Sequence, residues 1–289
     1  MKVTGFTFVR NAVQYDYPVV EAITSVLPVC DEFVVLVGDS ADHTRQLIEG
    51  IGSPKIRIID SIWDDTLRAG GKVLASETDK AFSQISSDTT WAFYIQADEV
   101  VHEKYLPAIL KAMQCHAGDR KVEGLLFRYQ HFYGSYDFIG DSTRWYRNEI
   151  RIVRFDPQVR SYRDAQGFRK AGRLLRVKPV EAYIYHYGWV KPPEKQQAKQ
   201  REFHRLWHPD EKVIEMVGDN SVFDYSRIDS LTRFQDTHPA VMKARIASKN
   251  WQFDFDPTKR RLSFKVRFKF FIERMTGWRI GEYKNFKVI

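Results

Sequence analysis

The first hundred residues alternate between apolar, strand-like runs and helix-like segments, and few folds accommodate that alternation. The strand-like runs cover residues 2–9, 32–37, 56–59 and 92–95. The helix-like segments between them cover residues 16–27, 44–49 and 72–85. A β-α-β-α-β-α-β series with short links predicts an α/β fold, in which helices cover both faces of a mostly parallel, Rossmann-like sheet.

The chain changes character after residue 122. Three aromatic, strand-like segments follow, at residues 124–133, 149–155 and 181–190. Pro192 and Pro193 then open a charged helix that we expect to end near residue 207, since proline suits a helix start. We therefore expect a mixed or antiparallel extension of the sheet, followed by C-terminal helices.

The fourth strand-like run leads directly into two adjacent carboxylates, Asp98 and Glu99. Ligands of open α/β sheets bind at the carboxyl edge of the strands. Carboxylate oxygens suit Mg²⁺ or Mn²⁺, which usually arrive bridged to phosphates. The run predicts a metal–nucleotide site, although a strand that ends in a solvated acidic turn has the same pattern.

The net charge of +8 is concentrated near the C-terminus. Residues 259–289 contain ten Lys/Arg and two Glu, whereas the rest of the chain has 35 residues of each sign. Cations mixed with aromatic residues suit peripheral contact with an anionic membrane. The alternative is a helix that packs its Phe face on the body. The neutral remainder argues against a nucleic-acid partner.

Two cysteines, Cys30 and Cys115, cannot build a disulfide framework and fit a reducing compartment. No run approaches the roughly 20 apolar residues that a membrane span needs. We expect a cytoplasmic protein that is peripheral at the inner membrane face, which is compatible with a role in polysaccharide biosynthesis.

Three segments resemble the landmarks of family 2 glycosyltransferases, in matching order and spacing. They are Phe8-Val9-Arg10-Asn11, Val37-Gly38-Asp39-Ser40-Ala41-Asp42-His43-Thr44 and Ile95-Gln96-Ala97-Asp98-Glu99-Val100. Such enzymes have a GT-A fold, in which a nucleotide-sugar-binding half precedes an acceptor-binding half. The resemblance implies a donor half at 1–122, an acceptor half at 123–190 and a C-terminal helical region with a basic tail at 191–289.

The implied activity is an inverting transfer of a sugar from a nucleoside-diphosphate sugar to a hydroxyl of a glycan or lipid-linked saccharide. By resemblance, Phe8, Arg10 and Asn11 border the nucleotide pocket. Asp39 is expected to hydrogen-bond the nucleobase. Lys72 follows a glycine in a segment that lies beside the base and the diphosphate.

The resemblance also implies a divalent cation, Mg²⁺ or Mn²⁺. Asp98 corresponds to the last acid of the metal-binding Asp-X-Asp motif, and Ala97 stands at its middle position. Gln96 stands in place of the first acid, so this site has one negative charge fewer and should bind a metal more weakly. Some GT-A enzymes supply a late histidine to the metal, and His186 is the candidate here.

An inverting transfer needs a carboxylate that removes the proton of the acceptor hydroxyl. The best match to the family's base is Asp164. It follows an Arg-rich strand, as the family's base does. The alternative is a turn-forming aspartate that pairs with Arg163 or Arg169. Glu99 and Glu149 are the next candidates for the base.

Two pairs of residues further along the chain have weaker signals. His204 and His208 are four residues apart, a spacing that can bind zinc, but with no third ligand evident we interpret them as a solvated helix face. Trp145 and Trp189 lie beside Arg or Gly and are candidates for a sugar-stacking surface.

Two other classes of function remain open from the sequence. The first is a nucleotidyltransferase or another nucleotide-binding enzyme. Against it, the chain has no Gly-rich phosphate loop near its N-terminus. The second is a non-catalytic protein that binds a membrane or nucleic acid through residues 259–289.

Overall fold

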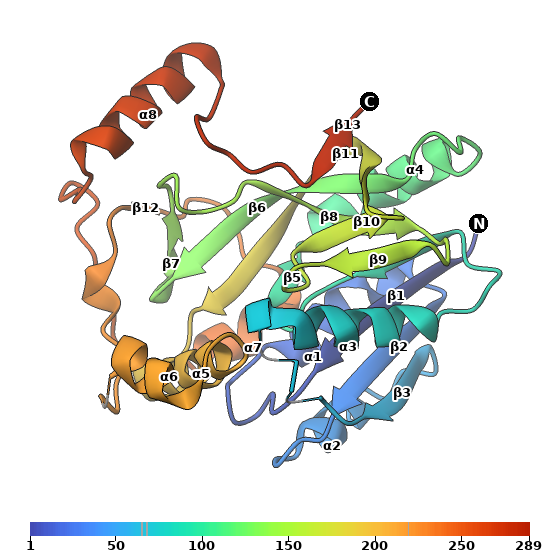
Figure 1. The fold of residues 1–289 in the computed structure, drawn as a ribbon, viewed down its shortest axis with the longest axis horizontal. Coiled ribbons are helices and arrows are strands. Elements are labelled where there is room, and N and C mark those ends of the chain that lie inside the picture. Colours follow the sequence, from blue (N-terminus) through green and yellow to red (C-terminus); the bar gives the residue numbers. More distant parts are fainter. Residues whose placement is uncertain (65, 68, 219) are drawn as a thin grey trace.

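One sheet runs through the molecule, and its first half is parallel. The computed structural model describes residues 1–64, 66–67, 69–218 and 220–289. Four neighbouring strands lie in the order β3-β2-β1-β4 and all run parallel. Their bounds are β1 Val3–Val9, β2 Glu32–Gly38, β3 Ile56–Ser61 and β4 Trp91–Tyr94. The predicted α/β fold and the four predicted strands are confirmed (Figure 1).

Helices cover both faces of this parallel half. Their bounds are α1 Val19–Val26, α2 Thr44–Glu49, α3 Lys72–Ser83 and α4 Leu106–His116. Ile23 of α1 and Met113 of α4 belong to one buried cluster, whereas Phe82 of α3 belongs to the cluster on the opposite face. The strands are therefore apolar on both sides, and the run 33–37 is buried throughout.

The second half of the sheet is the predicted mixed extension. The order continues from β4 as β8-β6-β11-β10-β9, with β4, β8 and β6 antiparallel and β11 parallel to β6. The bounds are β6 Gly124–Tyr133, β8 Asn148–Arg154, β9 Val159–Tyr162, β10 Gly167–Lys170 and β11 Arg173–Trp189. Shorter strands pair along the edges: β5 Glu99–Val101, β7 Ser135–Gly140, β12 Leu231–Arg233 and β13 Phe286–Val288.

The hairpin of β9 and β10 folds over the same face as α3. Phe168 of this hairpin packs against Phe6, Phe82 and Tyr94, with ring centroids 5.4–6.4 Å apart. Burial of these aromatic rings fixes the hairpin on the sheet. As a consequence, the turn between its two strands lies near the end of β4.

The remaining helices are C-terminal to the sheet. They are α5 Pro193–Arg205, α6 Asp210–Val217, α7 Lys243–Ala247 and α8 Phe264–Thr276. In Figure 1, α5 and α6 lie side by side, and α8 projects from the body. Among the described residues, no helix is both long enough and apolar enough to cross a bilayer.

Helix α8 contradicts the alternative in which its Phe face packs on the body. Phe264, Phe268 and Phe271 are 85%, 53% and 60% exposed, and Met275 is 70% exposed. These residues recur at helical spacing and form one stripe. The opposite side holds the helix in place, because Glu273 pairs with Arg147 at 2.8 Å.

Candidate active site

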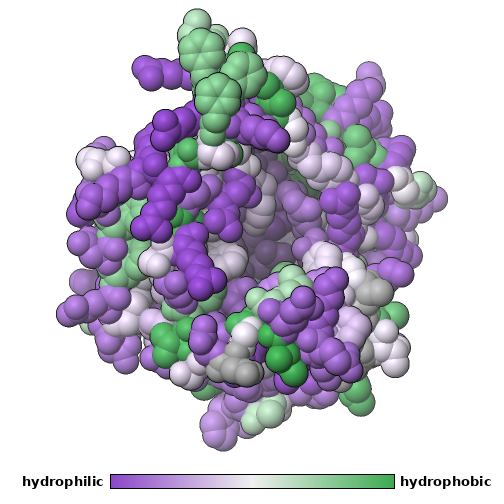
Figure 2. Space-filling model, turned by 60° about the vertical axis from the view of Figure 1, so that its left-hand side comes forward, coloured by the Kyte–Doolittle hydropathy of each residue, from purple (hydrophilic) through white to green (hydrophobic). Residues whose placement is uncertain are grey.

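A cavity of about 470 Å³ lies at the carboxyl ends of β1 and β4, and residues of α5 also line it. Figure 2 shows the molecule hollowed near the centre of the face that carries it. Seven of the residues predicted for the donor, metal and base roles line this cavity: Phe8, Arg10, Gln96, Ala97, Asp98, Asp164 and His186. Segments that are up to 178 positions apart in the chain thus meet in one place, at the sheet edge where open α/β folds bind ligands.

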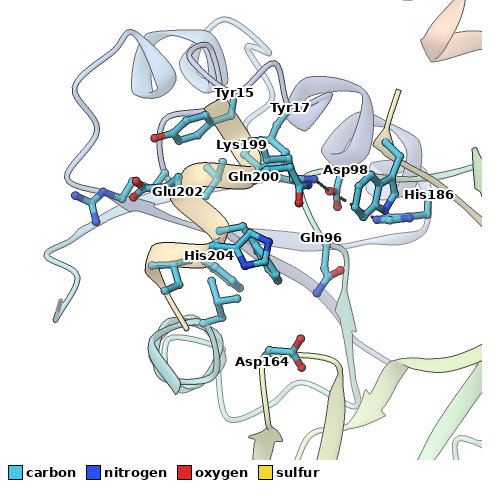
Figure 3. A pocket seen from close by; sticks show the side chains of 18 of the residues that line it. Tyr15, Tyr17, Gln96, Asp98, Asp164, His186, Lys199, Gln200, Glu202 and His204 are labelled. Atoms are coloured by element: carbon cyan, nitrogen blue, oxygen red, sulfur yellow. Dashed lines mark hydrogen bonds and ion pairs between the residues drawn. The ribbon is translucent and has the colours of Figure 1, made fainter. Parts of the chain in front are cut away.

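Asp98 lines the cavity and contacts a lysine. Nζ of Lys199, from α5, is 2.9 Å from Oδ2 of Asp98, and both side chains are only 12% exposed (Figure 3). Burial alone would raise the pKa of Asp98. The Lys199 ammonium and the neighbouring His186 outweigh burial and hold this pKa well below its usual value. Asp98 is therefore a carboxylate across the whole physiological pH range.

Two histidines from neighbouring strands, His131 of β6 and His186 of β11, support Asp98. His131 is buried, and burial lowers its pKa, so its ring is neutral. Its Nε2–H donates to the carbonyl of Tyr146 at 2.8 Å, and its Nδ1 therefore accepts from Nδ1–H of His186 at 3.0 Å. This leaves Nε2 of His186 facing Asp98, 3.7 Å from Oδ2.

Gly188 makes room for this cluster. A Cβ at this position would lie 2.5 Å from Nε2 of His186 and 2.7 Å from Oδ2 of Asp98. The backbone carbonyl of Gly188 also accepts a hydrogen bond from Lys199 at 2.9 Å. Any side chain here would displace the residues that the cavity brings together.

Asp164 projects into the cavity from the opposite wall (Figure 3). It stands in the turn between β9 and β10, where Arg163 and Ala165 on either side have φ values of 59° and 63°. Non-glycine residues rarely adopt this conformation, and they tend to do so at functional sites. Burial raises the pKa of Asp164, which makes its carboxylate a stronger base than an ordinary aspartate.

The proposed pairing of Asp164 with a neighbouring arginine is not seen among the described residues. The guanidinium of Arg163 lies over the ring of Tyr283 at 4.3 Å, and that of Arg169 lies over the ring of Tyr162 at 3.7 Å. Both cations are engaged with aromatic faces. The carboxylate of Asp164 therefore faces the cavity rather than an ion-pair partner.

Gln96 holds the turn of Asp164. Its Nε2 donates to the carbonyl of Ala165 at 3.3 Å and to the hydroxyl of Tyr94 at 3.5 Å. Arg151 donates to the carbonyl of Gln166 at 3.1 Å, from beneath the same turn. The side-chain amide of Gln96 thus positions the candidate base.

The two next candidates for the base are wrong. Glu99 is fully buried and is held by Arg151 through hydrogen bonds of 2.7 and 2.8 Å, with a third from Tyr129 at 2.7 Å. Glu149 does not line the cavity, and burial raises its pKa to about 8, which keeps it protonated at neutral pH. Neither group can accept a proton from a substrate in the cavity.

The remaining predicted donor residues lie around the cavity. Arg10 lines it and stacks over Trp63 at 5.3 Å. Asp39 lies 3.5 Å from Nε of Arg10 but borders a neighbouring cavity. Asn11 accepts a hydrogen bond from the amide of Ala41 at 2.8 Å, which joins the loops after β1 and β2.

Lys72 is exposed at the first position of α3 and does not line the cavity. The residue before it, Gly71, has a φ of 67° and lies against Asp164 and Trp207. Contact with the diphosphate by Lys72, and with the base by Asp39, remain predictions.

Most of the residues that α5 contributes to the cavity were not predicted from the sequence. Lys199, Gln200, Glu202 and His204 all line the cavity. His204, which the sequence analysis interprets as part of a solvated face, is half-buried and lines the cavity, and burial lowers its pKa. Tyr17 and Trp63 were missed as well, because single aromatic residues in loops carry no periodic signal.

The donor set around Asp98 does not fit a divalent cation. Within the described residues, no cluster of three or more His, Cys, Asp or Glu side chains is placed to hold a metal ion. Asp98 and His186 are the two candidates, and the ammonium of Lys199 already lies against Oδ2 of Asp98. A divalent ion at this oxygen would be repelled by that ammonium.

Comparison with known proteins finds no family model and no curated protein that matches the sequence. Among solved structures, S. aureus TarS is 15% identical, with a TM-score of 0.41, over 70% of this chain and 39% of that chain. A structure of TarS 1–349 in complex with UDP is 15% identical, with a TM-score of 0.40, over 76% of this chain and 70% of that one.

Glucosyl-3-phosphoglycerate synthase from Mycobacterium tuberculosis, in complex with Mn²⁺, UDP and phosphoglyceric acid, is also similar. It is 15% identical, with a TM-score of 0.30, over 46% of this chain and 43% of that one. TarS and the synthase are GT-A glycosyltransferases, the class that the three sequence segments resemble. These similarities concern the fold.

Proposed function

We propose that the protein transfers a sugar from a nucleoside-diphosphate sugar to a hydroxyl acceptor, with inversion at the anomeric carbon. One observation carries the proposal. A single cavity presents a carboxylate of raised basicity, Asp164, on one wall and the cations Arg10 and Lys199 on the others. A transfer of this kind needs a base at the attacking oxygen and positive charge at the leaving diphosphate.

The cavity offers a place for each part of the donor. Phe8 and Trp63, whose rings are 5.8 Å apart, give an aromatic wall for the nucleobase. The diphosphate would lie toward Lys199, and the sugar would lie between the diphosphate and Asp164.

In the chemical step, the acceptor oxygen forms a bond to the anomeric carbon while Asp164 takes the hydroxyl proton. The bond from the anomeric carbon to the diphosphate oxygen breaks, and its electron pair leaves with the nucleoside diphosphate. The acceptor would approach through an adjacent cavity of about 240 Å³ that Trp145 and Trp189 line. These two rings give the stacking surface that a saccharide needs.

The isosteric substitution Asp164→Asn tests the base. Asn cannot take up the proton, so transfer should fall at least about a hundredfold while nucleoside-diphosphate affinity is retained. UDP, which the TarS and synthase complexes contain, is the first nucleotide to test. Asp88→Asn, at an exposed carboxylate away from the cavity, is the matched control.

Product analysis separates this proposal from a nucleotidyltransferase. Glycosyl transfer releases a nucleoside diphosphate, whereas nucleotidyl transfer releases pyrophosphate. Turnover by Asp164→Asn at the rate of the unmodified protein would remove Asp164 from the mechanism.

We also propose that α8 docks on an anionic membrane and brings the cavity to a lipid-linked acceptor. The exposed stripe of Phe264, Phe268, Phe271 and Met275 is flanked by cations, including Lys265 and Arg267. In Figure 2, hydrophobic side chains gather on the projection at the top of the molecule. An apolar stripe between cations is the pattern of a helix that lies in a membrane interface.

A further inference from the structure

We infer that Lys199 takes the place of a divalent cation, so that this protein binds a nucleoside diphosphate without a metal. The inference rests on the proposed function, because it assigns the diphosphate subsite of the same cavity. It departs from the metal dependence that the sequence resemblance implies, and it starts from the poor fit of the Asp98 cluster to a metal.

Lys199 is built into the wall of the cavity rather than attached to its surface. Its Nζ lies 2.9 Å from Oδ2 of Asp98 and 2.9 Å from the carbonyl of Gly188, and it lies 5.0 Å from the ring centre of Tyr17. An ammonium has three N–H groups. These two acceptors occupy two of them, and the third is available to a phosphate oxygen in the cavity that Lys199 lines.

The charge balance explains why a lysine pairs with Asp98 where Gln96 replaces the first acid. Two carboxylates at this corner would need a divalent cation for neutrality. Here the first position is the neutral Gln96, and the single carboxylate of Asp98 is balanced by the single charge of Lys199. The loss of one negative charge at position 96 is therefore matched by the use of a singly charged lysine in place of a doubly charged metal ion. This explains why Gln96 can stand where the family usually has an acid.

The other potential metal ligands near Asp98 are few, and they already form hydrogen bonds within the protein. The amide of Gln96 is bonded to Ala165, and His186 is bonded through Nδ1 to His131. Displacing Lys199 would expose the carbonyl of Gly188 and leave a buried ammonium without its partner. Loss of such a partner is costly in a buried site.

The test measures binding of UDP, GDP and ADP to the 289-residue chain by calorimetry, once with excess EDTA and once with millimolar MnCl₂. We expect at least one of the three to bind in EDTA with an affinity within about threefold of that in Mn²⁺. In Lys199→Ala, affinity in EDTA should fall on the order of ten- to a hundredfold, the effect of losing one charge-assisted hydrogen bond.

Lys195→Ala is the matched control, since Lys195 lies one turn earlier on α5 and does not line the cavity. Its affinity in EDTA should equal that of the unmodified protein. Binding that requires Mn²⁺ in the unmodified protein would overturn the inference while leaving glycosyl transfer intact. Equal affinities of Lys199→Ala and Lys195→Ala in EDTA would overturn it too. Failure of all three nucleotides in both buffers would remove the proposed function together with the inference.

Discussion

The buried ion pair of Glu99 and Arg151 supports the candidate site from below, and the substitution Glu99→Gln probes it. Arg151 donates two hydrogen bonds to Glu99, and the two side chains are 0% and 1% exposed. Gln keeps the size of Glu and can still accept from Tyr129. It removes the negative charge and turns an NH₂ group or a neutral oxygen toward the guanidinium.

The expected loss of stability follows from the burial of both partners. Breaking a fully buried ion pair leaves an uncompensated charge and costs about 3–5 kcal/mol. A chain of 289 residues has an unfolding entropy of roughly 0.6 kcal/mol per degree at about 2.1 cal/mol/K per residue. The melting temperature should therefore fall by about 5–8 °C.

Differential scanning calorimetry measures this shift. Glu49→Gln is the matched control, because Glu49 pairs with Arg45 at 2.9 Å on the surface of α2, where both side chains are more than 40% exposed. An exposed pair of this spacing contributes about 0.3–0.5 kcal/mol, so the control should move by less than about 1 °C. Equal shifts in the two variants would refute the reasoning that burial decides the cost.

Three further outcomes are expected. First, kcat/KM should fall on the acid side at a pH above the ordinary range of aspartate, because burial raises the pKa of Asp164 and its protonated form cannot act as a base; a rate that is constant down to about pH 4 would contradict this. Second, the pKa of Glu149 rises from 4.5 to about 8 on folding, so its contribution to stability is present below pH 4.5 and is lost as pH rises to about 8. Urea titrations should show that E149Q lacks this decline, which amounts to at most roughly 5 kcal/mol, and parallel pH profiles of the two proteins would argue against it. Third, F268E/F271E should weaken binding to vesicles that contain phosphatidylglycerol by at least about tenfold without changing nucleotide affinity, and unchanged sedimentation with vesicles would exclude α8 as the docking element.

The parallel half of the fold was predictable because its signals are local. Each buried strand is an apolar run, and α2 begins and ends where the sequence predicts, at Thr44 and Glu49. The hairpin of β9 and β10 and the short strand β5 were missed. Each of these strands has only three or four residues, too few for a periodic signal, and their pairing shows only in the folded structure.

The residues of the candidate site could be predicted from the sequence only where they directly follow a strand of the sheet. Asp98 follows β4 directly, so the position of its carboxylate is fixed by the sheet. Lys199 is different, because α5 also contains Lys195 four residues earlier and the two have similar sequence surroundings. Only the packing of α5 over the sheet edge decides which lysine reaches Asp98. The sequence of α5 is charged on all sides, so it did not indicate that Lys199 would contact Asp98. That contact most changes the interpretation of the metal site.

Gln96 links the two halves of the proposed chemistry. An aspartate at this position would have no side-chain N–H to donate, and its carboxylate would be repelled by the carbonyl of Ala165. The amide of Gln96 instead donates to that carbonyl and holds a turn whose flanking residues adopt unfavourable φ values. The same residue leaves Asp98 as the single acid of the corner, so that one lysine is sufficient to balance it. A neutral hydrogen-bond donor at position 96 thus suits both the positioning of the candidate base and the proposed metal-free diphosphate site. The acid that the resemblance leads one to expect would suit neither.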